Sequence, residues 1–229
     1  MSEYHRIASL EKIIEEQKLA ISQISHEIRN PVTLINSSLQ LIEQEHPEVT
    51  TFAFWKETQT DMRYLIELLD ALSQYNNGES FLTETINTYV WLMELVSSMK
   101  ITSTESRRFT HAISPALLPI NGNPVKLFQA LTNLLRNGFE ALTGTGEVSL
   151  KAFMKEHKLH IHVGDTGCGI PPEYLDTMFD PFVTHKAEGS GLGLAITKRI
   201  IEAHNGTLGV HSVLHQGTVF KIILPVINH

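Results

Sequence analysis

The chain has 229 residues, of which 42% are hydrophobic and 19% are charged. This size and composition fit one large or two small globular domains. The formal net charge is −7 and lysine and arginine form no long run, which argues against a nucleic-acid surface because phosphate neutralisation needs clustered cations. The single cysteine, Cys168, cannot form an internal disulfide, and no stretch approaches the ~18 apolar residues of a membrane span. We therefore expect a cytoplasmic chain, or the cytoplasmic part of a membrane-bound receptor.

The first forty residues predict one long helix. Its apolar positions alternate spacings of three and four, which is the a/d pattern of a coiled coil with one polar member. These positions are Ile7, Leu10, Ile14, Gln17, Ile21, Ile24 and Ile28. A helix that packs only on its own domain is the alternative interpretation. Pro31 has no backbone donor, and it predicts a local kink in this helix.

A second amphipathic helix is predicted after a break over residues 45–48. Its apolar seam is Trp55, Thr58, Met62, Leu65, Leu69 and Leu72. The two helices together predict a helical hairpin over residues 1–77. Such a hairpin buries little by itself, so the expected solution is a homodimer in which two copies form a four-helix bundle. Asn76, Asn77 and Gly78 then break the pattern and mark the predicted domain boundary.

Residues 78–229 mix helices and strands. We predict helices over 88–99, 124–142 and 192–204, and strands over 108–113, 116–120, 147–154, 159–164, 208–213 and 218–224. Asn123 is the expected N-cap of the second helix, with Pro124 at its first position. The elements lack a regular βαβ rhythm, which favours an α/β sandwich over a Rossmann sheet and the α+β class for the whole chain.

Two glycine motifs in this half have the residue types of a nucleotide site. Asp165 follows a predicted strand, where its carboxylate can accept a hydrogen bond from the exocyclic amine of adenine. Gly167 and Gly169 let the backbone after it approach a flat base. The glycine run over residues 189–193 leads into a helix, whose N-terminus favours phosphate. Each motif alone is also common in ordinary turns.

Asn133 and Asn137 lie four residues apart on a predicted helix and therefore share one face. Their amide oxygens can ligate Mg²⁺ together with phosphate oxygens. The alternative is a polar stripe on an otherwise buried helix.

In this order the motifs resemble the GHKL ATPase superfamily. With the stretch Phe179-Asp180-Pro181-Phe182-Val183-Thr184-His185-Lys186 between the last two, they resemble the catalytic domain of sensor histidine kinases. The resemblance covers about residues 109–224, and Ser25-His26-Glu27-Ile28-Arg29-Asn30-Pro31 resembles the phosphoacceptor box of that family. It implies an ATP-dependent autokinase that phosphorylates His26 and passes the phosphoryl group to a response regulator receiver domain. An upstream sensor domain or protein would supply the input.

The resemblance also implies a Bergerat-type site for ATP and Mg²⁺. Asp165 would bind the adenine amine, Thr218 would lie near the base, and Asn137 would ligate Mg²⁺ with support from Asn133. The remaining ATP-binding positions are Arg136, Gly167, Gly169, Phe182, Thr184, Lys186, Gly189, Gly191, Leu192 and Gly193. Phe182 would anchor the lid, although a phenylalanine of the core is an equal interpretation.

The chain departs from the family pattern at two places. Glu140 and Ala141 stand where many members have Lys-Tyr, so Lys186, together with Arg136, would have to neutralise more of the phosphate charge. Gly138 stands where alanine is commoner, at a cost of ~1 kcal/mol in helix stability.

The heptad pattern places His26 at position f, opposite the seam, where it would face solvent or a docking partner. One ring nitrogen of the neutral imidazole can attack phosphorus while Glu27 holds the proton on the other. Asn30 lies on the same face four residues later, and the resemblance gives it a water-orienting role in a reverse phosphatase activity.

Two alternative functions are a GHKL ATPase and a non-catalytic module that binds a response regulator. The ATPases that resemble this chain carry a glutamate where Asn133 stands, and asparagine cannot serve as a general base. The intact lid and both asparagines, Asn133 and Asn137, argue against a non-catalytic module. His160 and His162 share one face of a predicted strand, but zinc needs three or four convergent ligands, so we interpret both as surface residues.

Overall fold

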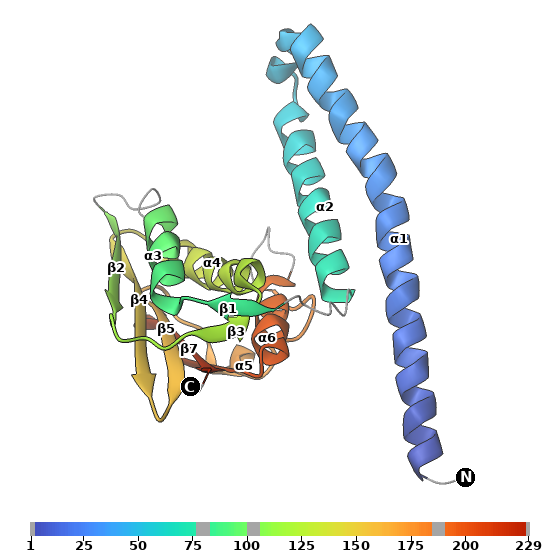
Figure 1. The fold of residues 1–229 in the computed structure, drawn as a ribbon. Helices are drawn as coiled ribbons and strands as arrows, with labels where there is room; N and C mark the ends of the chain where they lie inside the picture. Colours follow the sequence, from blue (N-terminus) through green and yellow to red (C-terminus); the bar gives the residue numbers. More distant parts are fainter. Residues whose placement is uncertain (1–2, 77–82, 100–105, 185–190, 228–229) are drawn as a thin grey trace. The chain divides into compact units, whose positions relative to one another are not determined.

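The computed structural model describes residues 3–76, 83–99, 106–184 and 191–227. The chain divides into two compact units, Met1–Glu79 with Thr184–Leu192, and Ser80–Val183 with Gly193–His229. The predicted boundary between residues 77 and 78 lies outside the described residues. The first unit contains a helical hairpin and the second is an α/β sandwich (Figure 1). The predicted α+β class is confirmed.

The hairpin consists of α1 (Glu3–Glu45), the short 3₁₀ helix η1 (Pro47–Thr51) and α2 (Trp55–Asn76). α1 contains no glycine and continues through Pro31. It ends at the predicted break, two residues before Pro47, because a proline disfavours helical geometry in the residue before it. The Glu43 carboxylate joins the two helices near the turn by accepting hydrogen bonds from Trp55 Nε1 at 3.2 Å and Gln59 Nε2 at 2.7 Å.

α1 has two seams that differ by about one residue in register. Among the α1 side chains that the structure describes, the least exposed ones face α2 at spacings of three and four: Ser25, Arg29, Val32, Asn36, Leu39 and Glu43. The described apolar part of the predicted a/d seam remains exposed, with Ile21 at 39%, Ile24 at 54% and Ile28 at 44%. One hairpin therefore buries one stripe of α1 and leaves this part of the heptad stripe uncovered.

The second unit is built on a five-stranded sheet in the order β2-β4-β5-β7-β6. Its elements are β1 (Glu84–Ile86), α3 (Thr88–Met99), β2 (Arg107–Ile113), β3 (Ile120–Gly122), α4 (Pro124–Ala141), β4 (Gly146–Lys155), β5 (Lys158–Asp165), α5 (Pro172–Leu175), α6 (Gly193–Ala203), β6 (Thr207–Val213) and β7 (Gly217–Pro225). β2 is parallel to β4, and the other neighbours are antiparallel. β1 and β3 form a separate two-stranded antiparallel sheet.

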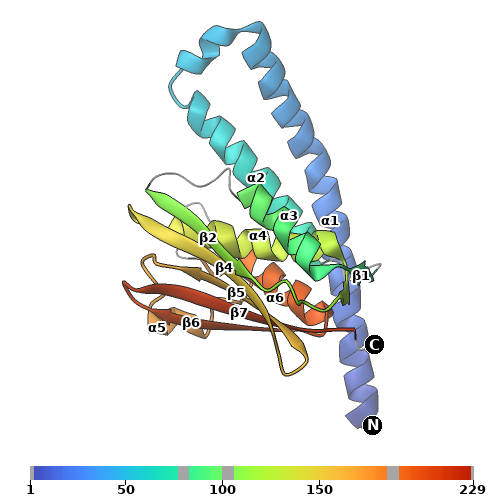
Figure 2. The ribbon, with the colours of Figure 1, turned by 60° about the vertical axis from the view of Figure 1, so that its left-hand side comes forward.

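Helices α3, α4 and α6 cover one face of the five-stranded sheet (Figure 2). Side chains on that face are fully buried, including Leu150 on β4 and Ile161 on β5, and they pack against leucines of α4 such as Leu134. Alternate residues of the same strands are half-buried or exposed on the other face. This alternation is the period of two that a sheet with one buried face requires.

Within the second unit, the sequence prediction was wrong for one strand and missed two short elements. Residues 116–119 are irregular, and the strand begins only at Ile120. The reason is that Pro115 and Pro119 cannot donate to a strand ladder. The missed elements are the three-residue strand β1 and the four-residue helix α5, which are too short for a periodic signal.

A buried histidine connects the ends of the two helices that form the candidate site. His204 lies just after α6 and is 5% exposed. Its Nε2 accepts a hydrogen bond from the Asn123 N–H at 2.9 Å, and its Nδ1–H donates to the Ile200 carbonyl at 2.7 Å. The side chain of Asn123 in turn caps α4 by accepting from the Lys126 N–H at 3.0 Å. The start of α4 is therefore fixed to the end of α6.

We expect His204→Ala to destabilise the α/β unit by about 2–4 kcal/mol, because it leaves the Asn123 N–H without its acceptor and opens a cavity. Urea unfolding in a Trp55→Phe background measures this, since Trp91 is then the single tryptophan and lies in that unit. His211→Ala, at an exposed position on β6, is the control and should stay within about 0.5 kcal/mol of the parent. Equal effects of the two changes would contradict this account.

Candidate functional site

Asn133 is held in one orientation between α4 and α6. Its Nδ2 donates to Thr197 Oγ1 at 2.9 Å, and that hydroxyl donates to the Gly193 carbonyl at 2.9 Å. A Cβ on Gly193 would lie 2.8 Å from Asn133 Oδ1, so only glycine permits this approach. The amide oxygen also accepts from Arg136 Nη2 at 3.3 Å. The network joins the asparagine helix to the first turn of α6.

Asn137 lies one helical turn after Asn133 and is half-buried. The next residue, Gly138, faces β4 and β5. A Cβ at Gly138 would meet the Val148 side chain at 3.3 Å and Asp165 Cβ at 3.4 Å. The absence of a side chain therefore lets Asp165 lie close to α4, directly beside the position of Asn137. This is a packing role for the glycine that departs from the family pattern.

Asp165 is the last residue of β5 and forms the start of a tight turn. Its Oδ1 accepts a hydrogen bond from the Gly167 N–H at 2.8 Å. Burial raises the pKa of the Asp165 carboxyl above its ordinary value, and backbone hydrogen bonds from Gly167 and Thr218 partly oppose this. Each carboxylate oxygen can accept more than one hydrogen bond, so this half-buried carboxylate is suited to accept a further one from an amine.

Thr218 lies on β7 directly opposite Asp165 and is 4% exposed. Its hydroxyl shares a hydrogen bond of 2.9 Å with Ser212 Oγ. Ser212 also donates to the Gly217 carbonyl at 3.1 Å and accepts from the Ile170 N–H at 2.8 Å. The serine thus ties the end of β6, the start of β7 and the glycine turn together beside Asp165.

The glycines of this turn have protein neighbours that the sequence interpretation did not anticipate. A Cβ on Gly167 would lie 2.5 Å from the Ala141 carbonyl oxygen, and one on Gly169, where φ is +69°, would lie 2.3 Å from the Val213 carbonyl oxygen. Both residues are needed for close backbone packing of the turn on α4 and β6. Approach to a base is therefore not required to explain either glycine.

The segment before α6 is described only in part. Lys186 and Gly189 lie outside the described residues. Phe182 is 58% exposed and has a φ of +65°, which is uncommon for a non-glycine residue. Its exposure excludes the interpretation as a core phenylalanine. Thr184 is exposed, Gly191 has a φ of +68°, and Leu192 is fully buried.

The segment that resembles a phosphoacceptor box, residues 25–31, lies in the middle of α1. Residues 25–31 are all helical, so His26 occupies a helix position between the buried Ser25 and the exposed Glu27. Asn30 is also exposed. Arg29 reaches α2 and donates from Nη2 to the Leu69 carbonyl at 3.3 Å. The box is therefore carried on a helix that α2 supports from one side.

Residues 122–228 match the sequence model of the histidine kinase-, DNA gyrase B- and HSP90-like ATPase family. The whole chain is similar to sporulation kinase A of Bacillus subtilis, with 32% identity over 94% of this chain. It is 33% identical to the sensor histidine kinase ZraS of Salmonella typhimurium over 95% of this chain. The chain belongs to the sensor histidine kinases. It spans 36% and 47% of the lengths of these two relatives.

Solved structures of histidine kinases have the same fold. ShkA, crystallised at full length with AMPPNP, superposes with a TM-score of 0.77 at 24% identity, over 92% of this chain and 46% of that one. The nucleotide-free catalytic domain of the histidine kinase ThkA covers 62% of this chain at 27% identity, with a TM-score of 0.56 and 95% of its own length matched.

Two features are absent from the described part of this histidine-kinase chain. No helix there is both long and apolar enough to cross a bilayer. No group of three or more His, Cys, Asp and Glu side chains there could hold a metal ion by itself.

Three residues of the candidate site escaped the sequence interpretation of the kinase domain. Thr197 and Ser212 orient site residues, and Gly217 has a φ of +111° with its Cβ position 2.0 Å from the Asp165 carbonyl oxygen. Thr197 had a visible signal, because it is a polar residue within the apolar stripe of α6. Ser212 had none, since serine at a strand end is ordinary.

Proposed function

We propose that this chain is an ATP-dependent protein-histidine autokinase of a two-component or phosphorelay system. The observation that carries the proposal is the convergence of three motifs on α4. Thr197 and Gly193 hold Asn133 against α6, and Gly138 brings Asp165 against the helix beside Asn137. Two asparagines, a carboxylate and a helix N-terminus are then neighbours along α4, and together they supply the polar groups that an Mg²⁺–ATP complex needs.

The two ends of the nucleotide would be bound by different elements. Asp165 accepts from the adenine amine and Thr218 lies beside the base. The phosphates would be bound by Arg136, by the start of α6 at Gly193, and by the preceding positions Thr184, Lys186, Gly189 and Gly191. Phe182 and the fully buried Leu192 would hold that segment in place. Gly167 and Gly169 shape the turn that holds Asp165.

The donor set around Asn137 fits Mg²⁺. This cation prefers oxygen ligands and usually takes only one or two from the protein, with phosphate oxygens and waters completing the octahedron. Asn137 would supply one amide oxygen, and Asn133 would support it. When bound, the ion would neutralise phosphate charge as the γ-phosphoryl group leaves ADP.

His26 is the proposed acceptor. One imidazole nitrogen forms the bond to the γ-phosphorus while the bond from phosphorus to the bridging oxygen of ADP breaks. Glu27 holds the proton on the other ring nitrogen and stabilises the positive charge that develops there. The phosphoryl group then passes to an aspartate of a response regulator receiver domain. Asn30 would orient water in the reverse, phosphatase direction.

The test of this function is incubation of the chain with γ-labelled ATP and Mg²⁺. We expect label on the protein that is lost in acid and kept in base, which is the behaviour of a phosphoramidate. Label that survives acid would indicate a phosphoester and would refute the histidine assignment.

Because an ATP substrate is cytoplasmic, we place the chain there, as a cytoplasmic protein or as the cytoplasmic part of a receptor controlled by an upstream sensor.

A homodimer through the hairpin is also proposed. The apolar side chains of Ile21, Ile24 and Ile28 on the a/d seam of α1 are exposed in the single chain, and a second copy would cover them. We expect Ile24→Glu, which places a charge at a d position, to yield monomers in analytical ultracentrifugation at micromolar concentration. Gln23→Glu, the same charge at an exposed neighbouring position, should leave the dimer intact. A parent mass near 25.7 kDa would refute the dimer.

Removal of the Asn137 amide should separate metal binding from base binding. Asn137→Ala is expected to weaken Mg²⁺–ATP about ten- to a hundredfold, because one amide ligand of the ion is lost. Affinity for ATP in EDTA should change little. Isothermal titration with and without Mg²⁺ measures both values, and Asn121→Ala on β3 is the control at an exposed asparagine. Equal losses in the two conditions would show that Asn137 is not a metal ligand.

A further inference from the structure

The sheet face away from the helices carries a cluster of basic side chains on β4 and β5. Asp165 on β5 lies against α4, so residues 160 and 162, which alternate with it, face the other side. The same alternation on β4 puts Lys151 on this outer face, opposite His162. None of the proposed nucleotide contacts uses these side chains.

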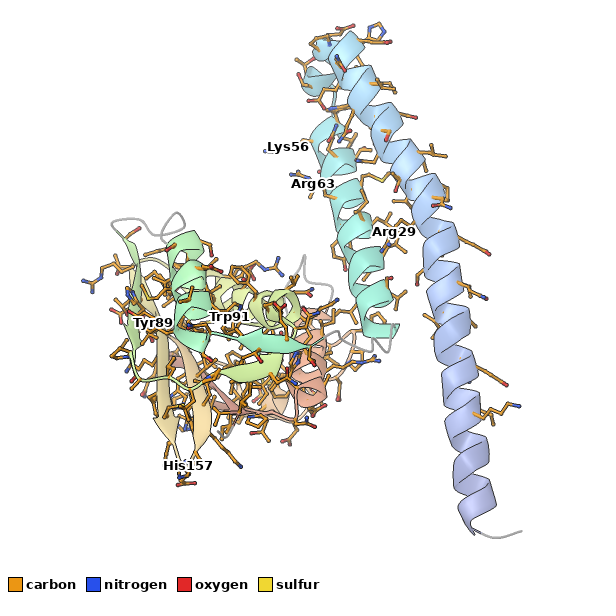
Figure 3. All side chains as sticks on the ribbon, viewed as in Figure 1. Arg29, Lys56, Arg63, Tyr89, Trp91 and His157 are labelled. Atoms are coloured by element: carbon orange, nitrogen blue, oxygen red, sulfur yellow. The ribbon has the colours of Figure 1, made fainter. Side chains whose placement is uncertain are left out.

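The cations form rows across the strands. Lys151 on β4, His162 on β5 and Lys221 on β7 are consecutive cross-strand partners, at the ~4.8 Å spacing of neighbouring strands. Lys155 and Lys158 form a second pair near the turn. The turn itself projects away from the rest of the unit, where Figure 3 labels His157. We call Lys151, Lys155, Lys158, His160, His162 and Lys221 the basic face.

Aromatic contacts hold the two imidazoles of the basic face in place. The Phe153 ring lies between them on the same face, with its centroid 5.4 Å from that of His160 in a stacked arrangement and 5.1 Å from that of His162 edge to face. The apolar Ile223 lies opposite His160 on β7. The face therefore combines ordered cations with half-buried apolar surface.

The basic face is electrostatically unfavourable in the chain by itself, because like charges on neighbouring strands destabilise a sheet. Burial lowers the pKa of His162, and the positive charges of Lys221, His160 and Lys151 lower it further. Among the described residues, one carboxylate forms an ion pair with this face. It is Glu156 in the turn, which lies 3.8 Å from Lys155 Nζ. The positive charges of the basic face repel one another, and a bound external anion would relieve this repulsion.

We propose that the basic face binds an acidic segment of a partner protein. The sequence charge decides between anionic partners. Residues 80–229 contain 12 acidic and 12 basic residues, and residues 1–79 contain 13 acidic and 6 basic residues. A long polyanion such as a nucleic acid, or an anionic bilayer, would extend beyond the basic face onto the rest of the chain, whose neutral or negative charge does not attract it. A short acidic segment would contact only the basic face, where Phe153 and Ile223 add apolar contact.

Binding of carboxylates would be coupled to protonation of the His162 imidazole. His162 is flanked by Lys151 from β4, Lys221 from β7 and His160 from its own strand. The carboxylates of a bound acidic segment would offset the effect of all three neighbours on His162. The bound state therefore favours the protonated form, so binding takes up protons. Affinity rises as pH falls through the histidine range.

The probe for this proposal is a fluorescein-labelled oligoglutamate of about ten residues, long enough to cross the face. It is titrated with the full chain at low salt near pH 6 and followed by fluorescence anisotropy. The double variant Lys151→Glu/Lys221→Glu should weaken binding at least about tenfold. The control is Lys56→Glu/Arg63→Glu, an equal charge change at exposed positions on α2 that Figure 3 labels, and it should bind like the parent.

A second variant keeps the test independent of charge reversal. His160→Gln/His162→Gln should bind the peptide but lose most of the gain in affinity between about pH 8 and pH 6. Thermal melts of all variants confirm the fold. Equal weakening by the face and control variants, or no binding of the peptide at millimolar concentration, overturns the proposal. Binding of a DNA oligonucleotide or of phosphatidylserine vesicles as tight as that of the peptide also overturns it.

Discussion

Substitution of His26 by glutamine is expected to abolish labelling of the chain by γ-labelled ATP. Glutamine keeps a polar side chain on the helix but has no ring nitrogen that can form a phosphoramidate. ATP binding should be unchanged, because His26 is not among the proposed nucleotide contacts. The measurement combines autoradiography with titration of a fluorescent ATP analogue.

The matched control for this prediction is His46→Gln. His46 lies in the same hairpin and is exposed, with Nδ1 3.1 Å from Glu48 Oε1. It should label like the parent. Persistent acid-labile phosphate on the His26→Gln variant would assign the acceptor to another of the 12 histidines.

Asp165→Asn should weaken ATP and ADP about equally, by roughly thirty- to a hundredfold, since a buried charged hydrogen bond to the base contributes ~2–3 kcal/mol. The variant should fold, because the amide oxygen can still accept from the Gly167 N–H. The other group of the asparagine side chain is then an NH₂ donor, which cannot accept a hydrogen bond from the adenine amine. Isothermal titration with ATP, ADP and GTP measures the effect, and GTP should bind poorly to the parent.

The same carboxyl predicts a pH dependence. Adenine needs the ionised form as acceptor, and burial raises the pKa of Asp165. ATP affinity should therefore fall as pH is lowered through a value above that of an exposed aspartate. Asp176→Asn, at an exposed carboxylate after α5, is the control. A selective loss of ATP but not ADP affinity would place Asp165 at the phosphates and contradict base recognition.

Periodicity in the sequence was sufficient for most of the fold. Helix α3 was predicted with its observed bounds, and α4 and α6 within one residue at either end, because capping and apolar spacing are local signals. The strand prediction over residues 116–120 was wrong because two prolines overrode the apolar composition. The position of β2 beside β4, in a parallel pair, could not be read from the chain because it depends on contacts between distant residues.

The sequence predicted the motifs of the candidate site but not the hydrogen-bond network that connects them. Asn133, Asp165 and the glycine runs have recognisable spacing. Their supports do not, because Thr197 and Ser212 act through hydrogen bonds to residues that are distant in sequence or on a neighbouring strand. The role of Gly138 became clear only from its distance to Asp165. The site residues themselves stay predictions until the substitutions above are measured.

The two seams of α1 have a consequence for how the hairpin unfolds. Contacts from Val32 and Leu39 to α2 form within one chain, so their strength does not depend on protein concentration. Contacts through Ile21, Ile24 and Ile28 would form between chains, so their contribution follows mass action. Heating a dilute sample should therefore first separate the chains and then melt each hairpin. Substitutions at Val32 would shift the melting temperature equally at every concentration, whereas those at Ile24 would remove its concentration dependence.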